Sequence, residues 1–291
     1  MNLEQKVVEW RHHIHQHPEL STKEFETAEF VANKLEEFGL EVHRNIGGTG
    51  VVGILKNGTS ARSMGLRADM DALHIHEQNT FNHTSKNDGV MHACGHDGHT
   101  AMLLGAAHVL ANNKRFDGTV HFIFQPDEER ATGAKAMIAD GLFTRWKMDA
   151  IYGMHNIPGV PAGQFITRPN SLMASESSFK IVINATGGHA ALPHMGTDPI
   201  VVGAQVVTAL QTIVSRNLSA IDETAIISVT NFETNGTVNV IPSQVTITGD
   251  TRSFTDSALG KIEKAIERVV EGQCISAGVD YEYHFNSTCW R

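Results

Sequence analysis

The 291-residue chain is 41% hydrophobic, and its 23 Lys and Arg residues against 32 Asp and Glu residues give a formal net charge of −9. A chain of this length and apolar content can form two domains, each with its own core. Because no Lys/Arg cluster interrupts the acidic balance and we expect no membrane-spanning segment, nucleic acids and membranes are poor partners and small substrates fit better.

The first half of the chain predicts alternating helices and strands. Apolar residues at helical spacing predict helices over residues 3–15 and 24–38. Strand-like runs follow at 40–44, 50–55 and 63–68, and a further helix is expected over 100–111. A strand at 118–125, a helix at 134–140 and a strand at 150–154 complete this part. Such alternation is typical of an α/β layer structure.

The stretch MHACGHDGHT contains the first candidate metal ligands, Cys94 and His96. A thiolate and an imidazole two positions apart can face one ion only if the backbone turns sharply, and Gly95 between them permits that turn. The alternative is a buried cysteine beside surface histidines. A lone Cys-x-His pair does not decide between the two.

Three predicted strands end in further ligand-type residues. Asp69 closes the third strand, Glu128 and Glu129 follow the strand 118–125, and His155 follows the strand 150–154. One of two adjacent glutamates can bind an ion while the other takes a proton from water. Taken one at a time, these residues have structural alternatives: the aspartate can cap a turn, and the glutamates can form the solvent-exposed start of a helix. Their coincidence at successive strand ends, beside Cys94, favours one common metal site.

The second half has a different pattern. A strand is predicted at 178–187, a helix at 198–217, strands at 224–233 and 244–254, a helix at 256–276 and a strand at 279–285. The order βαββαβ is that of a ferredoxin-like unit, complete in itself. We therefore expect a domain boundary near residues 174–178.

Taken together, these motifs resemble a metallopeptidase family that includes aminoacylases, succinyl-diaminopimelate desuccinylases and bacterial carboxypeptidases. The resemblance is closest to the branch of hippurate hydrolase, indoleacetyl-amino-acid hydrolase and other N-acyl-amino-acid amidohydrolases. The matching stretches occur in family order over essentially the whole chain. They are HPELS, GLRADMDAL, MHACGHDGHTAMLLGAA, FQPDEE, GMHNIPG, GGHAALPH and NVIPSQVTITGDTRSF.

The resemblance implies a role for each candidate residue of the first half. Cys94 would bridge two divalent ions, Mn or Zn, and His96, Glu129 and His155 would be further ligands. Glu128 would be the general base and then the general acid. Asp69 would be a carboxylate that orients the site without binding the ions.

For the second half, the resemblance implies a homodimer made by the smaller domain. His189, in the GGH stretch, would reach the active site of the partner subunit and hold the scissile carbonyl oxygen. Asn239 and Arg252 match positions implied in binding the substrate carboxylate, for which an arginine is suited by its bidentate geometry. The alternative for Arg252 is a salt bridge on the face of the sheet.

The predicted fold is therefore α/β with two domains. Residues 1–176 would form a catalytic α/β/α domain with a central mixed sheet, and residues 177–291 an inserted βαββαβ ferredoxin-like dimerisation domain. In the family the catalytic domain resumes after this insertion and supplies a last histidine ligand, so we expect the chain ending at Arg291 to lack that returning segment. A local departure is DALHI, where the branch usually has DALPI.

The expected activity is metal-dependent hydrolysis of the amide bond of N-acyl amino acids. An inactive truncated fragment or pseudoenzyme that only dimerises is one alternative, and a dipeptidase or aminopeptidase of the same family is another. The three cysteines, Cys94, Cys274 and Cys289, lack CxxC spacing. They predict a reducing compartment, which we take to be the cytoplasm.

Overall fold

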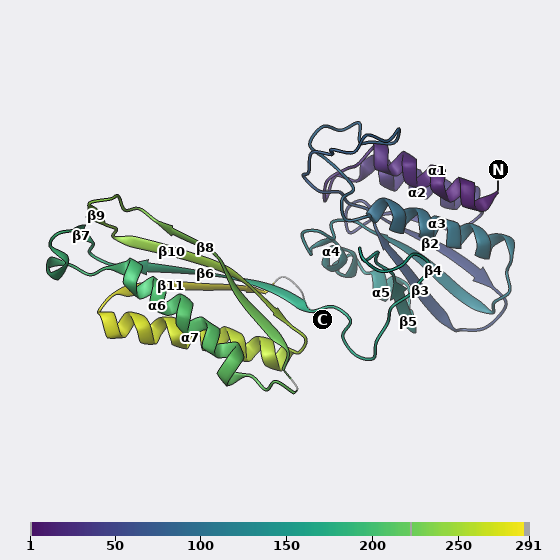
Figure 1. Cartoon of the computed structure of the whole chain (residues 1–291). Helices are drawn as coiled ribbons and strands as arrows, with labels where there is room; N and C mark the ends of the chain where they lie inside the picture. Colours follow the sequence, from purple (N-terminus) through teal and green to yellow (C-terminus); the bar gives the residue numbers. More distant parts are fainter. Residues whose placement is uncertain (1, 222, 288–291) are drawn as a thin grey trace. The chain divides into compact units, whose positions relative to one another are not determined.

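The computed structural model describes residues 2–221 and 223–287 of the chain. The chain forms two compact units, Met1–Ala162 and Gly163–Arg291 (Figure 1). The first strand of the second unit begins at Ser175. Cys94 and Cys274 are free thiols, and Cys289 lies outside the described residues.

The elements of the first unit follow the predicted order. They are α1 (Leu3–Gln16), α2 (Phe25–Glu37), β1 (Glu41–Ile46), β2 (Gly50–Asn57), β3 (Ser63–Asp69), α3 (His96–Asn112), β4 (Gly118–Gln125), α4 (Gly133–Ala139), α5 (Leu142–Arg145) and β5 (Ala150–Gly153). Two details differ from prediction. The four-residue α5 is too short to give a periodic signal. Helix α3 begins four residues earlier than expected, because Gly95, at a φ of 93°, turns the chain directly into it.

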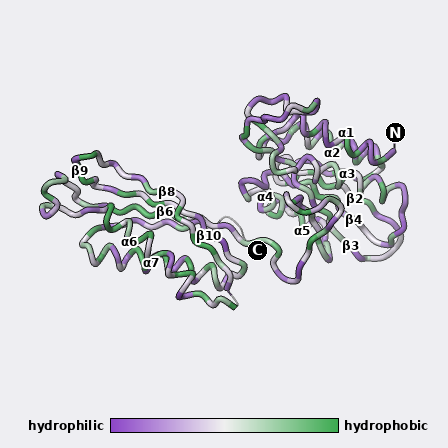
Figure 2. The backbone as a smooth tube through the Cα atoms, in the orientation of Figure 1, coloured by the Kyte–Doolittle hydropathy of each residue, from purple (hydrophilic) through white to green (hydrophobic). Residues whose placement is uncertain are grey.

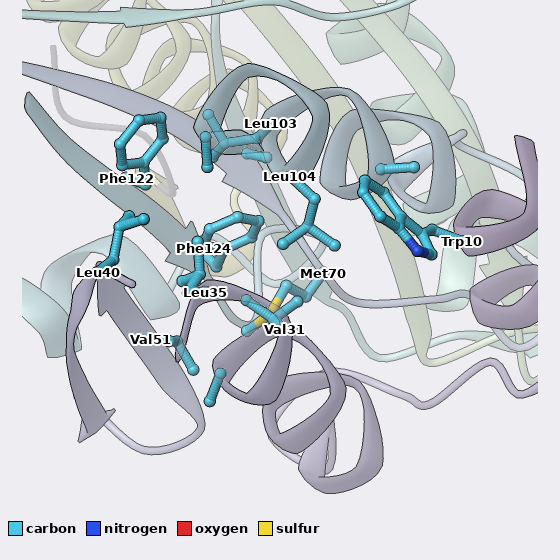
Figure 3. Close-up of a cluster of buried hydrophobic side chains, with 14 of the residues drawn as sticks. Trp10, Val31, Leu35, Leu40, Val51, Met70, Leu103, Leu104, Phe122 and Phe124 are labelled. Atoms are coloured by element: carbon cyan, nitrogen blue, oxygen red, sulfur yellow. The ribbon is translucent and has the colours of Figure 1, made fainter. Parts of the chain in front are cut away.

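A central mixed sheet in the order β1-β2-β4-β3-β5 forms the middle layer of this unit, as predicted. Strand β3 is parallel to both β4 and β5, whereas β1 and β2 are antiparallel additions. One face packs against α1, α2 and α3, where Phe122 and Phe124 meet Leu35 and Leu104 (Figure 3). On the opposite face, Ile123 packs in a smaller cluster with residues of α4 and α5. Helices thus cover both faces of the sheet.

The second unit has the predicted βαββαβ order. Its elements are β6 (Ser175–Asn184), β7 (Gly188–His189), the short 3-10 helix η1 (Pro193–Met195), α6 (Pro199–Thr212), the π-helical turn η2 (Ile213–Asn217), β8 (Ala225–Thr234), β9 (Val240–Ile241), β10 (Gln244–Ser253), α7 (Asp256–Ala277) and β11 (Asp280–Ser287). An antiparallel sheet in the order β11-β6-β10-β8 packs one face on α6 and α7. Alternate residues of β10 are buried, so the sheet has one apolar and one polar face, and its hydrophobic residues gather along the strands and α6 (Figure 2).

The expectation that no segment of the chain is long and apolar enough to span a membrane was wrong. Residues Pro199–Asn217 have a mean hydropathy of 1.2, long and apolar enough by composition to cross a membrane. Their apolar face is nevertheless used within the unit, because Val202, Val206, Leu210 and Ile213 are buried in its core. This segment is therefore the core helix of the second unit.

Candidate metal centre

The parallel strands β4, β3 and β5 bring their carboxyl ends to one edge of the first sheet. Asp69 is the last residue of β3, Glu128 and Glu129 follow β4, and His155 follows β5. His96 is the first residue of α3, which packs against β3. The crevice at this edge is where open α/β sheets place their binding sites.

His96 has one ring nitrogen committed and the other free. Its side chain is fully buried, and Nδ1 lies 3.1 Å from Asp71 Oδ1. A carboxylate on Nδ1 fixes the tautomer and leaves the Nε2 lone pair available to a cation. Nε2 lies 3.8 Å from Glu129 Oε1 and 3.9 Å from Glu128 Oε2. Both Nε2 and Glu129 Oε1 are buried without a hydrogen-bond partner among the described residues.

Cys94 and His155 form the second half of the centre. Cys94 Sγ lies 3.4 Å from His155 Nε2, and His155 Nδ1 donates to the Asn156 carbonyl oxygen at 2.7 Å. The donated proton leaves Nε2 as the nitrogen that faces the sulfur. Cys94, His96 and His155 offer ligand atoms within 4.8 Å of one another, and His96, Glu128 and Glu129 do the same.

These two groups share His96, so the structure brings all four predicted ligands and the predicted base to one place. Two ligand atoms of one zinc-like ion, each about 2.0–2.2 Å from it, lie about 3–4 Å apart. The Cys94–His155 and His96–Glu129 separations fall in that range. Buried polar atoms without partners are rare in proteins. The orphaned atoms of His96 and Glu129 therefore fit divalent metal ions.

The charges around the centre set the protonation of its groups. Burial disfavours the charged form of His96, but the hydrogen bond to Asp71 and the nearby Cys94 and Asp69 side chains outweigh it and raise the pKa of His96 to about 11. Without a metal, this imidazole is protonated on both nitrogens, and a cation would replace the proton on Nε2. Burial, together with the negative charges of Asp69 and Glu129, raises the pKa of Glu128 above its usual value, although His96 opposes this. A raised pKa makes a carboxylate a better base.

Asp69 lies beside the centre. It is fully buried, and it is hydrogen-bonded by Arg67 Nη1 at 2.6 Å and by His99 Nδ1 at 2.6 Å. Burial alone would raise the pKa of Asp69, but the His99 hydrogen bond and the Arg67 charge hold it well below its usual range. The carboxylate thus stays ionised and fixed, 3.7 Å from His96 Nε2.

Asp71 was not among the candidate residues named from the sequence, although it lies at the same strand end as Asp69. Besides holding His96, its carboxylate accepts the Ser21 hydroxyl at 2.7 Å and the Glu129 backbone N–H at 3.0 Å. It therefore joins two candidate ligands. His99 was missed altogether. Its position one helical turn after His96 is the signal that could have found it.

The candidate residues of the second unit lie at two different places. His189 is exposed on β7, which pairs with β9, and the Ala190 N–H donates to the Asn239 carbonyl at 3.0 Å. Arg252 lies near the far end of β10 and forms ion pairs with Glu176 at 3.0 Å and Asp250 at 2.9 Å. His189 and Asn239 are thus brought together, whereas Arg252 is not brought to them.

A family model described as Peptidase family M20/M25/M40 matches residues 65–284. The chain belongs to this family. Among its relatives, the hippurate hydrolase of Campylobacter jejuni is 42% identical over 286 residues, which cover 98% of this chain and 74% of that protein. The N-acyl-L-amino acid amidohydrolase of Geobacillus stearothermophilus is 42% identical over 283 residues, covering 96% of this chain and 75% of that protein.

Two solved structures of family relatives are similar over 98% of this chain. A putative aminohydrolase from methicillin-resistant Staphylococcus aureus is 40% identical with a TM-score of 0.92, and 76% of that chain is covered. The YXEP protein of Bacillus subtilis, described as a dinuclear metal binding peptidase from the M20 family, is 34% identical with a TM-score of 0.84, and 74% of it is covered. The M20 chain described here is a metal-dependent hydrolase of the amidohydrolase and peptidase type.

Proposed function

We propose that this M20 hydrolase cleaves the amide bond of N-acyl amino acids, such as N-acetyl or N-benzoyl amino acids. The products would be a carboxylate and a free amino acid. The observation that carries the proposal is the buried pair of His96 Nε2 and Glu129 Oε1, which lack partners among the described side chains and have the Glu128 carboxylate beside them. The relatives named hippurate hydrolase and N-acyl-L-amino acid amidohydrolase support the substrate class.

Cys94, His96, Glu129 and His155 would hold two divalent ions, Mn or Zn. Bound there, the ions supply Lewis acidity to the scissile carbonyl and lower the pKa of a water molecule. Thiolate, imidazole and carboxylate together do not select one of the two metals. The free thiol of Cys94 is consistent with a reducing compartment, and we place the enzyme in the cytoplasm.

Glu128 would carry the proton through the reaction. Its carboxylate takes the proton from the attacking water as the new carbon–oxygen bond forms. The same proton then passes to the leaving nitrogen as the carbon–nitrogen bond breaks, which regenerates the carboxylate. The raised pKa of Glu128 suits both transfers, because a group titrating nearer to neutral pH can accept and return a proton.

His189 is prepared to donate a hydrogen bond. The Ala191 backbone N–H donates to His189 Nδ1 at 3.1 Å, which places the imidazole proton on the exposed Nε2. A donor aimed at the carbonyl oxygen stabilises the charge that develops there. Asn239, next to His189 across the β7–β9 pair, would bind the substrate carboxylate together with Arg252.

These second-unit residues support a site shared by two chains. In the β6–β10 register, Arg252 pairs with Glu176 at one end, and Gln244 pairs with Asn184 at the other end. Asn184 is close in sequence to β7, which carries His189. The eight residue-to-residue steps from Gln244 to Arg252 span about 26 Å of strand. A single second unit therefore cannot present His189 and Arg252 to one small substrate. A homodimer can, if one chain supplies His189 and the other supplies Arg252.

The Glu128→Gln variant tests the chemistry. We expect it to keep its bound metal and to lose about 10²–10⁴ in kcat, the usual contribution of a general acid–base group. Metal content is measured by elemental analysis, and turnover by release of free amino acid from N-acetyl and N-benzoyl substrates. Glu267→Gln, at an exposed position of α7, is the matched control and should behave as wild type.

Two outcomes would contradict the proposal. Faster cleavage of unblocked dipeptides than of N-acylated amino acids would identify a peptidase instead. The absence of metal-dependent turnover on either substrate class would favour the non-catalytic, dimerising alternative.

A further inference from the structure

His99 is a buried histidine that is not among the proposed ligands. It is 3% exposed and lies on α3, one turn after His96. Its Nδ1 is 2.6 Å from Asp69 Oδ1 at the end of β3. Its Nε2 is 3.1 Å from the backbone nitrogen of Asn156, beyond the end of β5, and 2.6 Å from the side-chain Oδ1 of the same residue. One imidazole thus connects three elements.

The directions of the hydrogen bonds at His99 follow from these partners. Asp69 Oδ1 is a carboxylate oxygen 2.6 Å from Nδ1, so it accepts the proton on Nδ1. Nε2 then accepts from the Asn156 backbone N–H, and the Asn156 side-chain amide beside it presents its NH2 group rather than its oxygen, since two acceptors would repel each other at 2.6 Å. Arg67 holds the other oxygen of Asp69 at 2.6 Å, which fixes the carboxylate end of the chain of hydrogen bonds.

Asn156 is also held from the side of the cysteine loop. A Cβ atom added to Gly95 would lie 2.3 Å from Asn156 Oδ1, so the loop backbone and the asparagine side chain are in close contact. Asn156 follows His155 directly, and its carbonyl oxygen accepts the His155 Nδ1 proton. Any shift of Asn156 therefore moves His155 relative to Cys94.

We propose that His99 is a positioning residue that sets the His155 imidazole against the Cys94 sulfur. It acts through its contact with Asn156, and its hydrogen bond to Asp69 holds it in place. The inference depends on the proposed function in one respect, namely that Cys94 and His155 bind metal. It gives Asp69 a specific task, since that carboxylate orients the centre through His99 rather than by touching an ion.

The test is cobalt(II) binding to the dialysed full chain, monitored by the sulfur-to-cobalt charge-transfer absorption that reports Cys94. His99→Phe keeps the ring volume but removes both hydrogen bonds. We expect it to weaken cobalt binding by about 10–100-fold, the usual cost of losing a partner of a metal ligand, and to weaken the charge-transfer band. The matched control is His121→Gln, which removes another buried histidine. His121 lies on β4, and its Nδ1 is 3.2 Å from the Oγ of Ser63 on β3.

Two conservative variants separate positioning from bulk packing. The amide of a glutamine at position 99 reaches the place of Nε2, whereas that of an asparagine reaches the place of Nδ1. We expect His99→Gln to retain more cobalt affinity than His99→Asn, because only the first keeps the link to Asn156. Should His99→Phe fail to fold, Asn156→Ala keeps the His99–Asp69 pair and the backbone contact but removes the Asn156 side-chain contacts with His99 Nε2 and the Gly95 backbone. We expect it to weaken the charge-transfer band, though less than His99→Phe.

The outcomes also separate this inference from the proposed function. Cobalt affinity and charge-transfer absorption equal to wild type in His99→Phe or Asn156→Ala would overturn the role of His99 while leaving the metal centre in place. A wild-type chain that binds no cobalt at all would overturn the metal centre itself, and the role of His99 with it.

Discussion

At the scale of single residues, Cys94 is the most specific test of the metal centre. A ligand thiolate and a structural thiol respond differently to replacement by serine, because only the first loses a soft donor to the metal. We expect Cys94→Ser to lower zinc or cobalt affinity by more than the roughly 10–100-fold cost of losing a supporting partner. Equilibrium dialysis measures the change.

Cys274 provides the control within the same chain. It is fully buried in the core of the second unit, and burial raises the pKa of its thiol to about 11. Such a thiol behaves as a small hydrophobic group. Cys274→Ser should therefore reduce stability and leave metal affinity unchanged. Equal metal loss in both variants would remove Cys94 from the ligand set.

His92 predicts a pH dependence of stability. It is 3% exposed, neither ring nitrogen has a partner in the described part of the chain, and burial lowers its pKa to about 4. Between pH 6.5 and pH 4 the unfolded chain binds a proton at this histidine that the folded chain does not. This group therefore lowers the free energy of unfolding as the pH falls, by about 2 kcal/mol between pH 7 and pH 5.

The measurement is urea unfolding of the metal-free protein at both pH values. Between pH 7 and pH 5, the free energy of unfolding of His92→Leu should fall by about 2 kcal/mol less than that of the wild type. Comparing the two proteins isolates His92, because the other histidines are present in both. His15, for example, has a raised pKa and shifts stability in the opposite direction in each of them. Identical slopes would show that His92 is protonated or solvated in the folded state.

At the scale of elements, the turn after β4 is held by contacts that its own sequence does not reveal. The buried Glu24, at the start of α2, accepts the Asp127 backbone N–H at 2.8 Å and the Thr49 hydroxyl at 2.6 Å. Asp127 has a positive φ of 51°, and the Gly133 N–H donates to its carbonyl at 3.0 Å. The turn that carries Glu128 and Glu129 is thus fixed at both ends.

Gly133→Ala should disturb this turn. The added Cβ would lie 1.7 Å from the Pro126 carbonyl oxygen, so the backbone must move. Overpacking of this kind costs about 1–3 kcal/mol, and we expect metal affinity to fall with stability. Gly272→Ala, with open space around its Cβ position on the exposed side of α7, should instead stabilise the chain by roughly 0.5–1 kcal/mol. Thermal unfolding and cobalt titration of both variants measure these effects.

The helices and long strands were predictable because their apolar residues follow helical or alternating periods. Elements as short as α5, β7 and β9 carry no such period, so sequence could not indicate them. The same limit applies to the site. The ligand types at strand ends were visible, but the partners of His96 and Asp127 come from residues 25 and 103 positions away in the chain.

At the scale of the whole molecule, the proposed two-chain site predicts complementation. His189→Ala and Arg252→Ala should each abolish most activity as homodimers. In a mixed dimer, one site receives both intact residues and the other receives neither. Random mixing after co-refolding should restore about a quarter of wild-type activity, since half of the dimers are mixed and each has one intact site.

Turnover and sedimentation of the mixture give the result. A double variant carrying both changes in one chain, mixed with itself, is the negative control. If a verified mixed dimer shows no restored activity, His189 of one chain does not act in the active site of the other chain.

The sequence by itself determined the α/β class of the first unit, the βαββαβ order of the second, and the candidate residues Cys94, His96, Glu128, Glu129 and His155. It could do so because periodicity and motif spacing are local properties of the chain. Only the tertiary structure showed that Asp71 leaves His96 Nε2 free and that His99 links Asp69 to Asn156. It also showed that Arg252, near one end of β10, lies far from His189, which belongs to the separate β7–β9 pair. Those facts depend on which distant segments pack together, and packing is decided by the burial of the whole chain.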